Sequence, residues 1–285
     1  MRVRQSVYAP ASKWGQLKPW EQYELRVRAF RLTHPREILS HDSALVANGL
    51  PLFGNPAQIH VFDGQRTSSV TIGDVMHHTS VNGRPPVTTG LGAATNLVET
   101  AIDIGRIRSR AHSLAVWDAV LRKGVDLDAI ARRWRSQASS RGTRALAWLT
   151  QRATRDSESP GESVSRALIE WLGYASPVLQ HPVETPEGAW RLDFAWLGAR
   201  VAGEFDGYEK YNLHGAGVDE AFRQEKRRED SLRRAGFRVA RWEYHDLSDP
   251  MRLDRILRSA GLVPVNPPDL AMLRAYRPTG PPRLA

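Results

Sequence analysis

The chain has 285 residues, of which 41% are hydrophobic, 25% charged and 8% aromatic. This composition is typical of a folded globular protein, and the length favours two domains over one. The sequence contains no cysteine, which excludes disulfides, zinc knuckles and thiol nucleophiles. The N-terminal segment is charged, and no apolar run is long enough to span a bilayer. We therefore expect a soluble, cytoplasmic protein with no membrane partner.

Positive charge is concentrated in the middle of the chain. In total, 40 Lys and Arg residues stand against 31 Asp and Glu residues, a net charge of +9. Between Arg122 and Arg155 there are nine basic residues and two acidic ones. Such a run either forms a solvated helical surface or contacts a polyanion, and we favour contact with DNA phosphates. The candidate nucleic-acid-binding residues are Arg132, Arg133, Arg135, Arg141 and Arg144, together with Arg227 from a later helix.

The predicted elements of the N-terminal half are short. We expect a helix over residues 17–31, a short helix from Ser40 to Gly49, and strands over 59–62, 68–72 and 75–79 separated by Asp-Gly and Gly-Asp turns. Residues 91–105 have helical spacing of apolar residues and predict a further helix. The nine histidines show no metal-ligand spacing, so we expect them to be sheet or surface residues.

The C-terminal half predicts a different order of elements. A linker over residues 156–161 is followed by a helix at 162–172, strands at 178–183, 190–197 and 200–206, a helix at 218–235 and a strand at 237–243. This order indicates an α/β fold. The last segment, residues 263–285, is rich in proline and is expected to be irregular or docked.

Three acidic residues lie on neighbouring predicted strands. Asp193 is in the middle of one strand, and Glu204 and Asp206 lie on the same face of the next. Clustered carboxylates repel at neutral pH unless a cation lies between them, and hard oxygen ligands favour Mg²⁺ or Mn²⁺. Such an ion supports hydrolysis of a phosphodiester. No Walker loop, dinucleotide fingerprint, nucleophile elbow or His-Glu-x-x-His helix is present.

These motifs resemble a known superfamily. Glu162 on a helix, Asp193 on a strand, then Glu204-Phe205-Asp206-Gly207, a basic helix and the strand FRVARW are similar to the PD-(D/E)XK nucleases. The nearest likeness is the branch related to very-short-patch-repair endonucleases. The resemblance covers residues 157–262 and implies a restriction-endonuclease-like mixed sheet flanked by helices, with a metal held by these four acids.

The resemblance is incomplete at the position of the catalytic lysine. Asp206 stands where the superfamily's usual Glu-x-Lys motif has lysine, and Lys210 stands where this branch commonly has histidine. Lys210 can orient water or neutralise charge, and Lys226 on the following helix is the other candidate lysine. Loss of catalysis is the remaining alternative.

Each candidate also has a purely structural interpretation. Asp193 and Glu204 can pair with nearby arginines, and Asp206-Gly207 can be a turn. Glu162 lies at the third position of a Ser-Pro-Gly-Glu capping box, which explains it without any catalytic role. Gln180 either accompanies the metal site or bonds to backbone. Arg228, like Arg227, is typical of a solvated helix face.

The N-terminal half resembles the body of the AbiEi-type antitoxin family. The segments VRQSVYAPA, SHDSALVANGL, QIHVF, VMHHT and PPVTTGLGAATNLVETA occur in family order over residues 1–105. The helices that usually precede the first of these segments in the family, and that form its winged helix, are not found before it. Antitoxin-like operator binding is therefore not the expected function of this half.

These interpretations predict four segments: an AbiEi-like α+β domain (1–105), a basic helical connector (106–156), a nuclease-like domain (157–262) and a tail (263–285). The predicted function is Mg²⁺- or Mn²⁺-dependent hydrolysis of DNA, in a phage-defence or toxin–antitoxin setting with a possible protein partner. The alternative is a non-catalytic DNA-binding or regulatory protein that keeps the nuclease fold.

Overall fold

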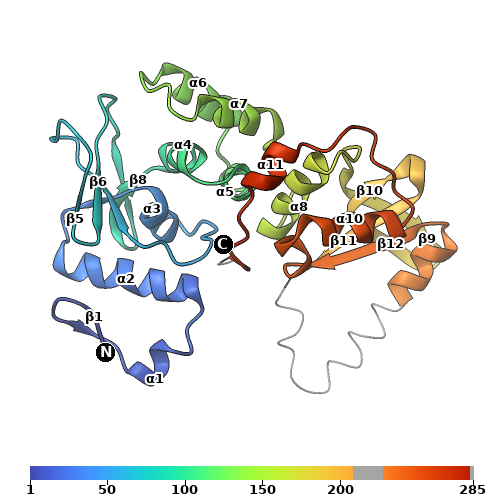
Figure 1. Cartoon of the computed structure of the whole chain (residues 1–285), viewed down its shortest axis with the longest axis horizontal. Helices are drawn as coiled ribbons and strands as arrows, with labels where there is room; N and C mark the ends of the chain where they lie inside the picture. Colours follow the sequence, from blue (N-terminus) through green and yellow to red (C-terminus); the bar gives the residue numbers. More distant parts are fainter. Residues whose placement is uncertain (208–226, 283–285) are drawn as a thin grey trace. The chain divides into compact units, whose positions relative to one another are not determined.

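The computed structural model describes residues 1–207 and 227–282. The chain divides into two compact units, Met1–Arg155 and Asp156–Pro281, and each is described separately. Figure 1 shows the helices and strands of both units. Helices and mixed sheets occur in each of them, which confirms the α/β class predicted from the sequence.

The first unit contains a mixed six-stranded sheet with strand order β5-β6-β4-β3-β8-β7. Its strands are β3 (Ile38–Leu39), β4 (Ile59–Phe62), β5 (Val70–Ile72), β6 (Val75–His78), β7 (Pro86–Thr89) and β8 (Gly92–Thr95). The pairs β4/β6 and β3/β8 are parallel and the other pairs are antiparallel. A separate antiparallel pair joins β1 (Arg2–Arg4) to β2 (Val7–Tyr8).

Strand β8 differs from the sequence expectation, which placed these residues in a helix. Ala94 pairs with Leu39 of β3 and with Val87 of β7, so the segment completes the sheet. The helix begins only at Leu97, because the Asn96 side chain accepts the Glu99 amide and caps it. Alanines such as Ala93 and Ala94 pack well in a helix or in a strand. Pairing with β3 and β7 therefore decides that this segment forms a strand, although its apolar residues have helical spacing.

The described helices of the first unit pack around a core that includes the predicted connector. They are α1 (Ala11–Trp14), α2 (Pro19–Thr33), α3 (His41–Ala47), α4 (Leu97–Ile107), α5 (Arg110–Arg122), α6 (Leu127–Ser136) and α7 (Thr143–Arg152). Helix α5 is buried on every side from Ala111 to Leu121. Trp117 lies at its centre and donates to the Ala101 carbonyl of α4 at 2.9 Å. A helix that is buried all round needs cover from its neighbours, so residues 106–155 belong to the first unit.

The second unit is built on a four-stranded sheet with order β12-β11-β10-β9. Its strands are β9 (Val178–Thr185), β10 (Gly188–Trp196), β11 (Val201–Asp206) and β12 (Arg238–Glu243). The first three strands form an antiparallel meander, whereas β12 pairs parallel with β11. Each strand overlaps the range predicted from the sequence. A short 3-10 helix, η1 (Leu197–Ala199), connects β10 to β11.

Helices cover both faces of this sheet. Helix α8 (Pro160–Trp171) lies against Trp242, whose indole donates to Ser165 at 2.8 Å. The helix described over residues 227–234 covers the other face, where Leu232 joins one apolar cluster with Ala202. Two further elements follow β12, namely η3 (Asp246–Ser248) and α10 (Pro250–Ser259). Among the described helices, none combines the length and apolar character needed to cross a membrane.

The proline-rich tail is docked on the second unit. The Val265 and Asn266 amides donate to the Gly173 carbonyl, and the Asp269 amide donates to the Trp171 carbonyl at 2.8 Å. Helix α11 (Leu270–Ala275) follows, and Tyr276 packs edge-on against Trp171. These bonds satisfy carbonyls at the end of α8.

Candidate functional site

Asp193 lies where β10 and β11 stop pairing. The last paired residues are Phe194 and Gly203, one position further into the sheet. Beyond them the Asp193 Oδ2 accepts the Phe205 amide at 3.0 Å, so a side chain replaces the backbone acceptor that regular pairing would supply. The carboxylate is thereby held at the carboxyl end of β11.

Along β10, the regular alternation of side chains between the two faces of the sheet is interrupted at Asp193. Leu192 and Ala195 belong to the same apolar cluster although they are three residues apart, which a regular strand does not allow. On the neighbouring strand, Gln180 has a positive φ of 49° in the left-handed region, which is uncommon for a residue with a side chain. The paired residues on either side show that Gln180 lies opposite Asp193. Backbone strain of this kind concentrates at functional sites.

Glu162 caps its own helix and also contacts this irregularity. Its amide donates to Ser159, the N-cap residue, and its Oε2 accepts the Glu158 amide at 2.9 Å. The same oxygen accepts the Gln180 amide group at 2.9 Å. Burial is the main cause that raises the pKa of Glu162; the Glu158 hydrogen bond opposes it, and the negative charge of Asp193 raises it further. The capping role and the proximity to Asp193 therefore coexist.

Glu204 is the most buried of the four acids, with 3% of its surface exposed. Two guanidinium groups neutralise it: Arg228 lies 2.7 Å from Oε1 and Arg241 lies 2.9 Å from Oε2. Arg241 also lies 3.3 Å from Asp206. A buried carboxylate is costly unless it is paired, so the arginines supply the positive charge that the sequence interpretation assigned to a metal alone.

The four acids are distributed over both faces of the sheet. Glu204 and Phe205 are neighbours on β11 and point to opposite faces. Glu204 points to the face covered by the helix over 227–234, because it pairs with Arg228 of that helix. Phe205 packs against α8, since a Cβ added at Gly161 would come within 2.1 Å of its ring. Glu162 belongs to α8, so it approaches the sheet from the face opposite to Glu204. Among the described residues, no group of three or more His, Asp or Glu side chains is arranged to hold a metal ion.

The structure adds two residues that sequence reasoning missed. Arg228 was expected on a solvated helix face, yet its guanidinium reaches the buried Glu204. Arg241 was not singled out, although it stands between Ala240 and Trp242 as a charge inside an apolar strand. The role of Arg241 can be recognised only when β12 is known to pair parallel with β11, because this pairing places Arg241 beside Glu204. The candidate lysines, Lys210 and Lys226, lie outside the described residues.

The basic candidates of the first unit divide into two groups. Arg133 faces inward: it forms an ion pair with the buried Glu99 and donates to the Gly83 carbonyl at 2.6 Å. The others keep their charge at the surface. The exposed members are Arg132, Arg135, Arg141 and Arg144. Arg227 of the second unit is exposed as well.

The fold and the site define an α/β protein of two units, with carboxylates and arginines gathered on a mixed sheet. Two uncharacterized proteins of Mycobacterium tuberculosis, from strains CDC 1551 and H37Rv, are each 31% identical to this chain over 179 residues. The match covers 59% of this chain and 64% of each relative, so it spans slightly less than two thirds of their length. No family model matches the chain, and no solved structure matches it.

Proposed function

We propose that the second unit is a metal-dependent deoxyribonuclease. The observation that carries the proposal is the meeting of Asp193, from β10, and Glu162, from α8, at Gln180. Gln180 lies opposite Asp193 and donates to the Glu162 carboxylate at 2.9 Å. The charge of Asp193 also contributes to the raised pKa of Glu162, after burial as the main cause. Glu162 and Asp193 each accept a backbone amide, but neither bond requires the two like charges to lie near each other in a partly buried position, where they repel. A bound cation gives this arrangement a physical reason.

The donor set suits Mg²⁺ or Mn²⁺. Carboxylate and amide oxygens are the hard ligands that these ions prefer. The Gln180 Oε1 is buried and has no hydrogen-bond partner in the described part of the chain, and a cation or its water would satisfy it. In this proposal Asp193 and Glu162 hold the ion, with Gln180 beside them. Glu204 and Asp206 lie on the face opposite to Glu162 and contact arginines instead. The bound ion would stabilise charge on a phosphodiester and make a coordinated water more acidic.

Arg241 and Arg228 serve the substrate in this proposal. Both side chains are partly exposed, at 32% and 20%, while the Glu204 carboxylate between them is buried. Guanidinium groups bind phosphate oxygens through paired N–H donors. Glu204 holds the two arginines in place and thereby positions them toward a DNA backbone. The net charge of +9 favours a polyanionic substrate.

A second candidate function is DNA binding without catalysis. The observation that favours it is the neutralisation of Glu204 by two arginines, because a carboxylate held in this way is less available to a metal. The two candidates differ in one outcome, which is cleavage.

The test is incubation of the full chain with supercoiled, linear and single-stranded DNA in Mg²⁺, Mn²⁺ or EDTA. We expect cleavage with either metal, none in EDTA, and loss of cleavage in Asp193→Asn. The control is Glu184→Gln, because Glu184 is an exposed carboxylate on the adjacent strand β9. DNA binding without cleavage in every metal would establish the second candidate, and equal cleavage by Asp193→Asn and the unmodified chain would refute the first.

A further inference from the structure

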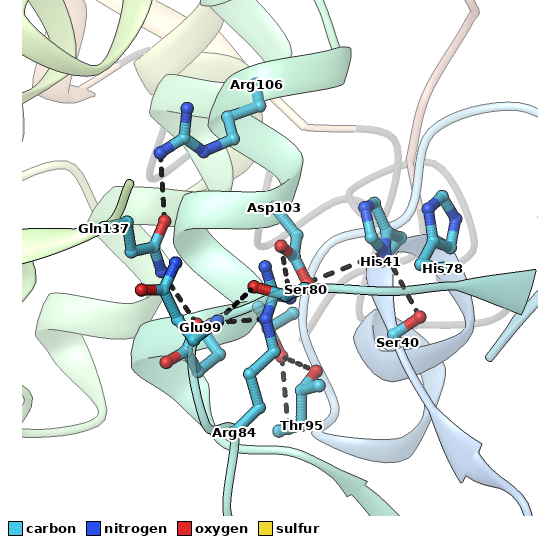
Figure 2. A network of polar contacts seen from close by, with 12 residues as sticks. Ser40, His41, His78, Ser80, Arg84, Thr95, Glu99, Asp103, Arg106 and Gln137 are labelled. Carbon is cyan, nitrogen blue, oxygen red and sulfur yellow. Dashed lines mark hydrogen bonds and ion pairs between the residues drawn. The ribbon is translucent and has the colours of Figure 1, made fainter. Parts of the chain in front are cut away.

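The first unit contains a cavity that plays no part in the proposed function. Its volume is about 590 Å³, which is the size of a small-molecule site. Strands β4 and β6, helices α3 and α4 and the segment before α7 contribute its wall. Figure 2 shows the polar network around it, with His41 and His78 beside Asp103 and the arginines Arg84 and Arg106 nearby.

Three histidines that are far apart in the sequence meet in this wall. The His41 and His78 rings stack with their centroids 3.6 Å apart. His60 Nδ1 lies 2.8 Å from His78 Nε2, at hydrogen-bonding distance. Burial is the main cause that lowers the pKa of all three, to about 4 for His60 and about 3 for His78. The rings are therefore neutral at pH 7, and each keeps one donor and one acceptor nitrogen.

Two buried carboxylates lie next to the histidine rings. Asp42 lies 3.5 Å from His60, and Arg108 neutralises Asp42 at 2.7 Å. Asp103 lies 3.6 Å from His41. His41 itself has a positive φ of 48°, a conformation that costs free energy for a residue with a side chain. A carboxylate beside a buried imidazole fixes the orientation of the ring. Packing of the core does not require a strained histidine in this arrangement.

The charged residues that line the cavity favour an anion. Its charged lining residues are three arginines, Arg84, Arg106 and Arg141, and one carboxylate, Asp103, an excess of two positive charges. Arg84 binds both oxygens of Asp103 at 2.6 Å and so cancels that carboxylate. Arg106 donates to Gln137 at 2.9 Å and to the Arg141 carbonyl, and both partners are neutral. The buried carboxylates that act on its charge are Asp103 and Glu99, which pair with Arg84 and Arg133. Arg141 is exposed, and within the described ranges no carboxylate pairs with its guanidinium.

We propose that this cavity binds a phosphomonoester, with Arg106 and Arg141 on the phosphate and the histidines and neighbouring hydroxyl groups as hydrogen-bond donors. Guanidinium groups recognise phosphate through several N–H bonds at once, and neutral imidazoles donate without adding charge. The phosphate comes from one of two sources, a free nucleotide or the 5′ end of a nucleic acid. This inference does not rest on the nuclease proposal, because it concerns the other unit.

The test is titration of the full chain in EDTA, which prevents metal-dependent cleavage. Isothermal titration with adenosine 5′-monophosphate and with adenosine measures the contribution of the phosphate. Anisotropy with 5′-phosphorylated and 5′-hydroxyl oligonucleotides of one sequence distinguishes the two sources. We expect binding of adenosine 5′-monophosphate but not of adenosine, and preference for the phosphorylated oligonucleotide only if nucleic-acid ends are the ligand.

Two variants tie the binding to the cavity. Arg141→Gln removes one cation and is expected to weaken adenosine 5′-monophosphate binding about tenfold. Arg144→Gln is the matched control, because Arg144 is also exposed and does not line the cavity. Asn82→Asp places a negative charge in the wall and is expected to weaken binding as well. Equal affinity for adenosine and its monophosphate, no binding of either, or equal loss in the Arg141 and Arg144 variants would overturn the proposal.

Discussion

Arg241 and Glu204 are partners in the parallel pairing of β11 and β12, and their side chains meet at 2.9 Å. We predict that Arg241→Met destabilises the protein by about 3 kcal/mol, the lower end of the cost of removing one partner of a buried ion pair, because Arg228 remains. Urea unfolding at pH 7 measures the loss. Glu204→Gln in the Arg241→Met background is expected to restore much of it, and a double variant as unstable as the single one would contradict the ion-pair account.

Added Mg²⁺ extends this experiment. Because Glu204 lies on the face opposite to Glu162, an ion held by Asp193 and Glu162 does not need Glu204, and Mg²⁺ is expected to stabilise Arg241→Met and the unmodified chain equally. Greater stabilisation of Arg241→Met would show that a Glu204 oxygen freed from Arg241 binds the metal, and would contradict the assignment of the ion to Asp193 and Glu162.

Gly161 lets α8 approach the sheet. A Cβ at this position would meet the Phe205 ring at 2.1 Å, so Gly161→Ala must displace the aromatic ring that follows Glu204. We predict a loss of about 1 to 3 kcal/mol, which is typical of overpacking, although alanine favours the helix itself. Thermal unfolding provides the measurement. Gly198→Ala is the control because it has nothing within 4 Å, and Phe205→Leu should partly rescue Gly161→Ala.

The histidine cluster predicts acid sensitivity of the first unit. The folded pKa values of His60 and His78 lie at about 4 and about 3, below the ordinary 6.5, so the unfolded chain binds more protons between these limits. Stability is therefore complete above pH 6.5 and falls as pH decreases, by up to about 1.4 kcal/mol per pH unit for each histidine. Asp103, with its pKa raised to about 6, and Asp42, whose pKa is also raised by burial, act in the opposite direction. His41 and His112, whose pKa values are lowered by burial, act in the same direction as His60 and His78, so four histidines oppose two carboxyl groups.

Unfolding midpoints between pH 7 and pH 5 check this slope. His78→Asn is expected to reduce the slope of stability against pH by the contribution of one histidine. The charged and titratable groups that face the cluster are Arg84, Arg108, Arg141, Asp42, Asp103 and His77. Parallel curves for the variant and the unmodified chain would show that His78 titrates normally.

In the basic segment, we predict that different arginines contribute to stability and to DNA binding. Arg132 and Arg135 are exposed, whereas Arg133 pairs with the buried Glu99. Arg132→Gln combined with Arg135→Gln should flatten the slope of log K against log salt by about 0.9 for each phosphate that the variant no longer neutralises. Arg133→Gln should instead lower the unfolding midpoint. An unchanged slope in the double variant would mean that these arginines do not touch DNA.

The local pattern of the sequence determined most elements of the second unit. Alternating apolar residues predict strands in its sheet, and Ser159 with Pro160 predicts the start of α8, because these signals act within a few residues. The same local signals misplace Gly92–Thr95, since sheet pairing with a distant strand decides between helix and strand there. The acids Asp193 and Glu204 could be chosen from sequence because charges inside apolar strands stand out.

Only the tertiary structure decided what surrounds those acids. Register places Arg241 beside Glu204, and helix packing brings Glu162 to the face opposite Glu204. The histidine cluster could not be predicted from sequence either, because His41 and His78 lie 37 positions apart (78 − 41) and meet only when α3 packs on the sheet that contains β6. Contacts between residues distant in the chain depend on the packing of whole elements. Residue spacing carries no information about such packing.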